Sequence, residues 1–138
     1  MADVKLAPGA DEVAMAVMLA DMLKANLEKP EKLKDFNKLK ARVYINAKDA
    51  ETEMTMVFDK GSLTVYGGKE GAPDISIITD AATLLDLANI NIKFGMPYYF
   101  DETGMAVVKK LLKRELQIKG MFTHYFALNH LTKIMSLN

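Results

Sequence analysis

The sequence contains no cysteine and no tryptophan, and its charges cancel. Without cysteine the chain cannot be a disulfide scaffold, hold a cysteine-ligated zinc ion or an iron–sulfur cluster, or use a thiol nucleophile. Lysine and arginine together number 18 and so do aspartate and glutamate, which gives a formal net charge of +0. A nucleic-acid-binding protein usually carries a basic excess. We therefore expect no nucleic-acid partner.

Long apolar runs and targeting signals are also missing. The longest apolar run covers only residues 13–20, whereas a helix needs roughly 20 apolar residues to span a bilayer. The amino-terminal residues lack a basic segment followed by an apolar stretch, and the carboxyl end matches no retention or peroxisomal address. These absences favour a cytoplasmic protein. The length of 138 residues predicts a single domain over residues 1–138, with residues 1–10 as a loose leader.

Side chains that could perform catalysis are sparse and poorly spaced. His124 and His130 are six positions apart, which places them about 240° from each other on a helix, not on one face as a zinc pair requires. The glycine-rich run at residues 67–71 precedes a predicted strand and lacks the helix amino terminus that holds phosphates. No serine lies in a nucleophile elbow. We predict no metal, no cofactor and no catalytic residue, so the chain is not expected to be an enzyme.

Methionine is the residue present in excess. The chain has 10 methionines among 138 residues, and half of all residues are hydrophobic. Methionine is unbranched and flexible, so it fills irregular space and adapts to varied ligands. An ordinary core and a cavity for an apolar ligand both explain this composition.

The hydrophobic spacing changes along the chain between helical and strand periods. A period near 3.6 predicts helices over residues 11–27, 30–40, 80–90, 102–114 and 121–136. A period of 2 predicts strands over residues 41–48, 52–58, 62–66, 74–79 and 116–119. Because the first four strands are joined by short connections, we expect them to form an antiparallel meander.

Residues 91–100 combine the glycine and proline of a loop with bulky side chains. Five of these fall within residues 94–100, whereas loops normally lie in water. Such side chains need burial against a ligand, a second subunit or the underlying sheet. The segment is therefore predicted to be either a lid over a binding site or an interface.

A basic stripe on the helix at residues 102–114 also has two interpretations. It consists of Lys109, Lys110, Lys113 and Arg114. The simpler interpretation is a solvated helix face. The functional interpretation is transient contact with an anionic membrane, since each basic residue near such a surface contributes about 1 kcal/mol.

Three stretches together resemble the sterol carrier protein type 2 family. The first is the hairpin of residues 54–65, and the second is the strand of residues 73–80 followed by the leucine-rich residues 84–87. The third is the short segment from Leu116 to Gly120 before the last helix. The order of predicted elements over about residues 10–137 is similar to that of the family.

The resemblance implies an α+β fold, with a five-stranded, mixed and largely antiparallel sheet and helices packed on one face around an apolar tunnel. It implies non-catalytic binding and intracellular transfer of a hydrophobic ligand such as a sterol, a fatty acyl chain or another lipid. On that fold, side-chain facing and spacing place the ligand against Met54, Met56, Leu63, Ile75, Ile77, Phe94, Met96, Tyr98, Tyr99, Phe100, Met105, Val108, Leu112, Phe122 and Tyr125.

An interaction or dimerisation module is the alternative function. In that case the aromatic segment 94–100 or the methionine-rich first helix would bury its side chains against a partner subunit, such as a second copy in a homodimer. A subunit can also cover the mouth of a tunnel, so the two functions are compatible.

Overall fold

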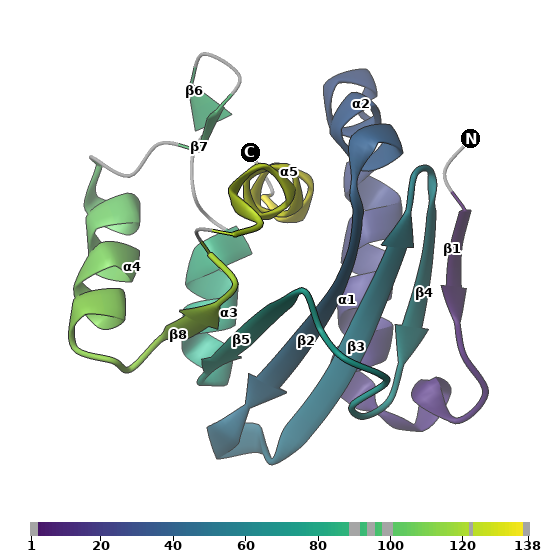
Figure 1. The fold of residues 1–138 in the computed structure, drawn as a ribbon, viewed down its shortest axis with the longest axis horizontal. Coiled ribbons are helices and arrows are strands. Elements are labelled where there is room, and N and C mark those ends of the chain that lie inside the picture. Colours follow the sequence, from purple (N-terminus) through teal and green to yellow (C-terminus); the bar gives the residue numbers. More distant parts are fainter. Residues whose placement is uncertain (1–2, 89–91, 94–95, 98–100, 122, 137–138) are drawn as a thin grey trace.

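A computed structural model gives the fold, and it describes residues 3–88, 92–93, 96–97, 101–121 and 123–136 (Figure 1). Six strands form one sheet in the order β1-β4-β3-β2-β5-β8. In chain order these strands are β1 Asp3–Leu6, β2 Lys40–Ala47, β3 Thr52–Asp59, β4 Ser62–Tyr66, β5 Ile75–Thr79 and β8 Gln117–Lys119.

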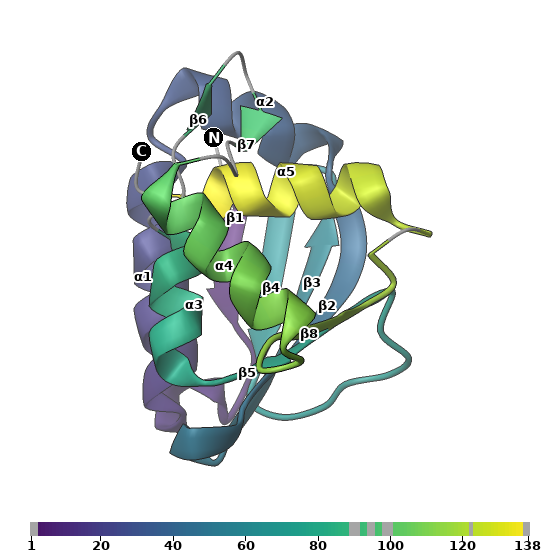
Figure 2. The same cartoon turned by 90° about the vertical axis from the view of Figure 1, so that its left-hand side faces the viewer.

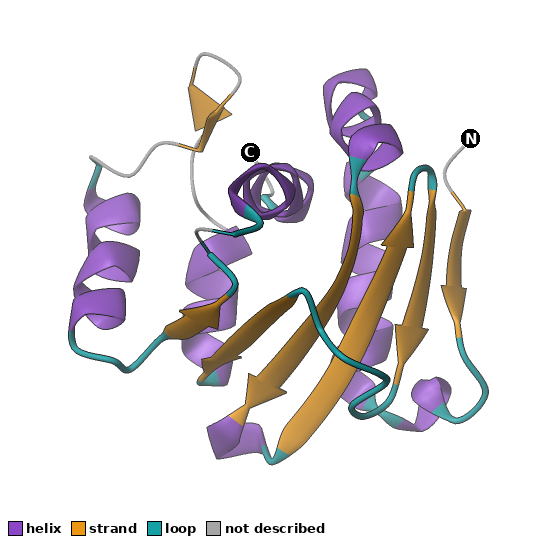
Figure 3. Cartoon of the chain, viewed as in Figure 1, coloured by secondary structure: helices purple, strands orange, loops and turns teal. Residues whose placement is uncertain are grey.

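The helices cover the sheet on one side and extend past its β8 edge (Figure 2, Figure 3). They are α1 Ala14–Asn26, α2 Pro30–Lys38, α3 Ala81–Ala88, α4 Glu102–Leu112 and α5 Tyr125–Met135. Two short 3₁₀ turns are η1 Ala10–Glu12 and η2 Lys48–Ala50, and a separate small hairpin joins β6 Ile92–Lys93 to β7 Met96–Pro97. The arrangement confirms the predicted α+β class and the mixed sheet.

The sheet has six strands where five were predicted, because β1 was not recognised. Residues 1–10 were predicted to be a loose leader, yet Asp3–Leu6 pairs in parallel with β4. Val4 and Leu6 pack against the core, while Asp3 and Lys5 are exposed. The strand covers the edge of β4, whose backbone groups would otherwise lack partners in the sheet.

The prediction of an antiparallel meander is correct for β2, β3 and β4 and wrong for β5. That strand does not continue beside β4 but lies parallel to β2. The connection over residues 67–74 passes across the sheet face opposite α1 (Figure 1). The Thr55 hydroxyl donates to the carbonyl of Gly68 at 2.7 Å and accepts from the backbone N–H of Glu70 at 3.0 Å. The short connection over residues 67–74 can therefore cross the sheet, because these hydrogen bonds hold it against β3.

The main core lies between the covered face of the sheet and α1, α2 and α5. Alternate residues of β3, including Met54 and Met56, are fully buried there. Phe36 on α2 meets Phe58 edge to face, with ring centroids 6.2 Å apart. Each Å² of apolar surface removed from water contributes roughly 25 cal/mol, so burial in this layer stabilises the fold. The core borders a cavity at the β8 end of the sheet.

Candidate functional site

An apolar cavity of about 250 Å³ lies at the β5–β8 edge of the sheet, beneath α4 and α5. Its size is close to the lower end of ordinary ligand pockets, which span about 300–1,000 Å³. None of the described residues that line it is charged. The lining consists of Ile77, Val107, Val108, Leu111, Leu116, Ile118, Met121, Tyr125, Leu128, Asn129, Leu131, Thr132 and Met135.

Helix α4 presents one narrow face to this cavity. Asp101 caps the helix, since its carboxylate accepts a hydrogen bond from the backbone N–H of Gly104 at 2.7 Å. Val107, Val108 and Leu111 then line the cavity, because positions i and i+4 share a helix face. Lys109 follows Val107 by two positions, or about 200° of rotation, so it lies on the opposite face.

Helix α5 forms the longer wall of the cavity. Tyr125, Leu128, Asn129 and Thr132 follow at the spacing of a single helix face. The turn into this helix depends on Gly120, whose φ is +82°. A Cβ atom at that position would lie 2.1 Å from the carbonyl oxygen of Asp74, so only glycine fits there.

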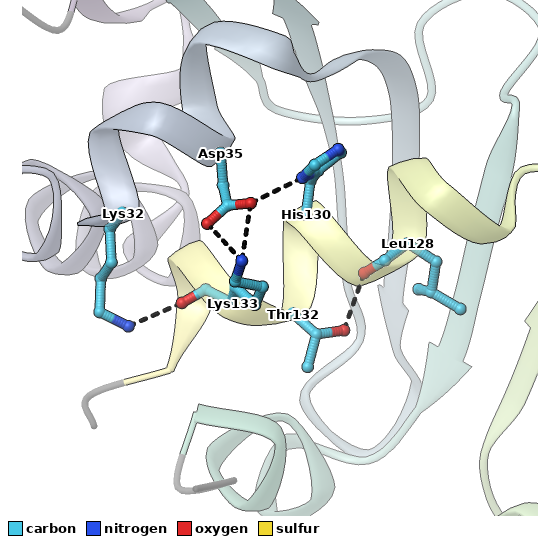
Figure 4. Close-up of polar contacts among 6 residues, drawn as sticks. All are labelled: Lys32, Asp35, Leu128, His130, Thr132 and Lys133. Carbon is cyan, nitrogen blue, oxygen red and sulfur yellow. Dashed lines mark hydrogen bonds and ion pairs between the residues drawn. The ribbon is translucent and has the colours of Figure 1, made fainter. Parts of the chain in front are cut away.

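Polar contacts fasten the other side of α5 to α2 (Figure 4). The Asp35 carboxylate lies 2.8 Å from Nζ of Lys133 and 2.8 Å from Nδ1 of His130. In addition, Nζ of Lys32 donates to the carbonyl of Lys133 at 2.7 Å and to that of Ser136 at 2.6 Å. These four contacts hold the wall of the cavity in place on the main core.

Lys32 is the buried cation of this group, with only 3% of its surface exposed. Burial lowers the pKa of its ammonium, and the neighbouring Lys29 lowers that pKa further. The charge is tolerated because it meets two carbonyls at the carboxyl end of α5, where the helix dipole favours cations.

The structure brings three of the sequence-predicted site residues to the cavity: Ile77, Val108 and Tyr125. The cavity lining includes neither Met105 nor Leu112, whose exposed fractions are 39% and 78%. Their positions on α4 rotate them away from the face that Val107 and Leu111 share. Four further predicted residues are fully buried in the main core and do not line the cavity, namely Met54, Met56, Leu63 and Ile75.

The aromatic segment is described only in part. Phe94, Tyr98, Tyr99, Phe100 and Phe122 lie outside the described residues, so the predictions that they gate a ligand or form an interface are not tested. Met96 belongs to β7, which lies next to α5. The alternative function through residues 94–100 stays a prediction for the same reason.

Most of the cavity wall was not among the predicted site residues. The residues that the prediction omitted include Leu111, Leu128 and Met135, which lie within the helices predicted over residues 102–114 and 121–136. The apolar stripe of the last helix was a usable signal for this part of the wall. The sequence did not show that this stripe faces α4 across a cavity.

Among the described residues no three histidine, aspartate or glutamate side chains gather in a way that could hold a metal ion. The described helices include none with the length and apolar character needed to cross a bilayer.

Comparison with known proteins identifies related sequences and folds. The model of the SCP-2 sterol transfer family matches residues 19–95, which is more than half of the chain. No curated protein matches the chain at a significant level.

Solved structures share the fold at low sequence identity. A structure named "UbiJ-SCP2 Ubiquinone synthesis protein" has a TM-score of 0.62 and 16% identity over 91% of this chain and 95% of its own. A crystal structure of sterol carrier protein 2 has a TM-score of 0.53 and 13% identity, covering 86% and 91% of the two chains. Sterol carrier protein 2 from Yarrowia lipolytica, in its apo form, has a TM-score of 0.50 and 17% identity over 86% and 89%. The family match and the shared fold lead to one conclusion: the chain belongs to the SCP-2 sterol transfer family.

Proposed function

We propose that residues 1–138 act as one domain that binds a hydrophobic lipid in the cavity beneath α4 and α5 and carries it without covalent change. The observation that supports this proposal is the cavity itself, whose described lining has no charged side chain, in a member of a sterol transfer family. The similar structures are named for sterol carriage and for ubiquinone synthesis, and both names fit an apolar ligand. A cytoplasmic location and the absence of catalysis belong to the same proposal.

The size of the cavity defines how the lipid is held. At about 250 Å³ it accommodates part of a lipid and leaves the remainder near the start of α5. Tyr125 lines the cavity and is 48% exposed, and Phe126 beside it is 78% exposed, with 5.7 Å between the ring centroids. This aromatic pair marks the mouth through which we propose the ligand enters.

Substituting Leu111→Glu tests the binding site, with Leu112→Glu as the matched control on the same helix. A carboxylate at Leu111 enters the apolar cavity, where an unpaired charge is strongly disfavoured. We expect this variant to lose at least tenfold in affinity for a pyrene-labelled long-chain alcohol, measured by fluorescence titration. The control changes a side chain that is 78% exposed, so it should bind like the parent protein. Equal binding by both variants would move the site elsewhere.

We also propose that the outer face of α4 contacts anionic membranes. Lys109, Lys113 and Arg114 are exposed there, and the exposed Leu112 and Met105 lie among them. Apolar side chains can enter the headgroup region while lysine ammonium groups remain at the phosphates. Lys110 was predicted to join this contact, but its ammonium donates instead to the hydroxyl of Thr83 at 2.9 Å.

Vesicle sedimentation tests this membrane contact. The double substitution Lys109→Glu/Lys113→Glu reverses two surface charges, and each basic residue near an anionic surface contributes about 1 kcal/mol. We expect at least a tenfold loss of binding to vesicles of phosphatidylcholine with 30% phosphatidylserine, a probe composition chosen as about one-third anionic. Lys34→Glu/Lys38→Glu, which changes two exposed sites on α2, is the charge-matched control and should have a smaller effect. If the control loses as much as the α4 variant, the contact is not specific to α4.

A further inference from the structure

Among the described residues, two polar side chains of the cavity lining have no hydrogen bond, those of Tyr125 and Asn129. The hydroxyl of Thr132 donates to the carbonyl of Leu128 at 2.9 Å, so it is already engaged. Tyr125 is half exposed at the mouth. The remaining polar group in the lining is the amide of Asn129, one helical turn beyond Tyr125 and thus about 5–6 Å further along α5.

Nearby cations point away from the cavity or are bound elsewhere. Lys109 lies on the opposite face of α4, and the ammonium of Lys110 donates to Thr83. Lys133 pairs with Asp35 on the α2 side of α5. Lys119 follows the cavity-lining Ile118 on β8, and successive strand residues point to opposite faces of the sheet. A carboxylate inside the cavity would therefore meet no partner of opposite charge among the described residues.

An uncharged oxygen suits these surroundings better than a carboxylate does. An ionised carboxylate loses its hydration on entering an apolar site and regains it only through an opposite charge or several hydrogen-bond donors. An alcohol or a carbonyl oxygen has a much smaller desolvation cost, and a single hydrogen bond satisfies it. The Asn129 amide can donate to a carbonyl and can both donate to and accept from a hydroxyl.

We propose that the cavity selects neutral lipids with an alcohol or carbonyl oxygen over fatty acid anions, and that Asn129 determines this specificity by hydrogen bonding to that oxygen. The inference rests on the proposed function, because it assigns the ligand class of the same cavity. It also gives the polar group of the ligand a position, one turn inside the mouth formed by Tyr125 and Phe126.

A pair of matched probes tests the inference. Two pyrene-labelled lipids of the same chain length, one ending in an alcohol and one in a carboxylic acid, are titrated at pH 8, where the acid is ionised. We expect the parent protein to bind the alcohol about tenfold more tightly. Asn129→Leu should weaken alcohol binding by about 3–10-fold, the value of one hydrogen bond, and leave binding of the acid almost unchanged. Asn37→Leu, an exposed site on α2, should change neither affinity.

A second variant protects the test against a folding artefact. Asn129→Lys places a cation in the cavity and should reverse the preference, so that the acid binds more tightly than the alcohol. The inference is overturned if the parent binds the acid as well as the alcohol, or if Asn129→Leu keeps the parent's preference. If neither probe binds the parent protein, the proposed function itself fails, and the inference fails with it.

Discussion

At the scale of single residues, the methionines of β3 fill the main core. Met54 and Met56 have no exposed surface, and they pack with residues of α1, α2 and the neighbouring strands. The sequence predicted their facing correctly, since both point to the covered side of the sheet. Their predicted contact with a ligand stays a prediction, while in the structure residues of α1 and α2 pack with them in the main core. Adaptable side chains here serve packing.

Met56→Ala distinguishes packing from ligand contact. Removing a buried methionine side chain leaves a cavity and costs about 2–5 kcal/mol, which urea unfolding measures. Affinity for the pyrene-labelled alcohol should stay within about twofold under conditions where the variant is folded. Met18→Ala, on the exposed side of α1, is the control and should change stability little. If Met56→Ala lost probe binding but kept the parent's stability, Met56 would belong to the ligand site.

At the scale of secondary-structure elements, the connection between α2 and α5 decides where the cavity wall stands. One face of α5 lines the cavity, while the other carries the contacts to Lys32 and Asp35 that Figure 4 shows. These pairs join residues about 100 positions apart, as between Lys32 and Lys133 at a separation of 101. Sequence periodicity predicted both helices, but a long-range polar contact of this kind has no periodic signal.

Lys32→Met tests this connection and has a defined pH dependence. The variant leaves two buried carbonyls without their donor, so we expect a loss of about 1–3 kcal/mol in the free energy of unfolding at pH 7. Burial lowers the folded pKa of Lys32 below its ordinary value of 10.5, so the unfolded chain binds more protons between these two values. The contribution of Lys32 to stability therefore rises with pH toward 10.5.

Urea unfolding of both proteins at pH 7, 8.5 and 10 measures this difference, at values chosen to approach the ordinary lysine pKa of about 10.4. The gap in stability between the parent and Lys32→Met should widen as the pH rises. Lys34→Met, an exposed change on the same helix, should have the same stability as the parent at all three pH values. A gap that narrows with rising pH would mean that the ammonium form is the better stabiliser.

At the scale of the whole molecule, the family model and the cavity involve different parts of the chain. The match covers residues 19–95, which include the central strands and most of the main core. Apart from Ile77, the cavity lining comes from residues 107–135, beyond the match. Membership of the family therefore accounts for the scaffold, whereas under the proposed function the choice of ligand would depend on α4, α5 and β8. Asn129 lies in this second region.

The sequence by itself determined the kinds of most elements and many of the faces that they bury, although β1 was missed and Met105 and Leu112 on α4 are exposed. Alternation in β2 to β5 and helical stripes in α4 and α5 reflect local backbone geometry, so they can be predicted without a partner. The motif order also led to the correct family. The zero cysteine count excluded whole classes of chemistry.

Only the tertiary structure decided which apolar faces meet each other and which leave a space. The pairing of β5 with β2, the addition of β1 and the cavity that α4 and α5 both line bring together segments distant in the chain. The physical reason is that burial is nondirectional: an apolar stripe favours any apolar partner equally. Long-range hydrogen bonds, such as those of Thr55 and Lys32, form in the observed arrangement of these faces. In that arrangement a cavity remains beneath α4 and α5.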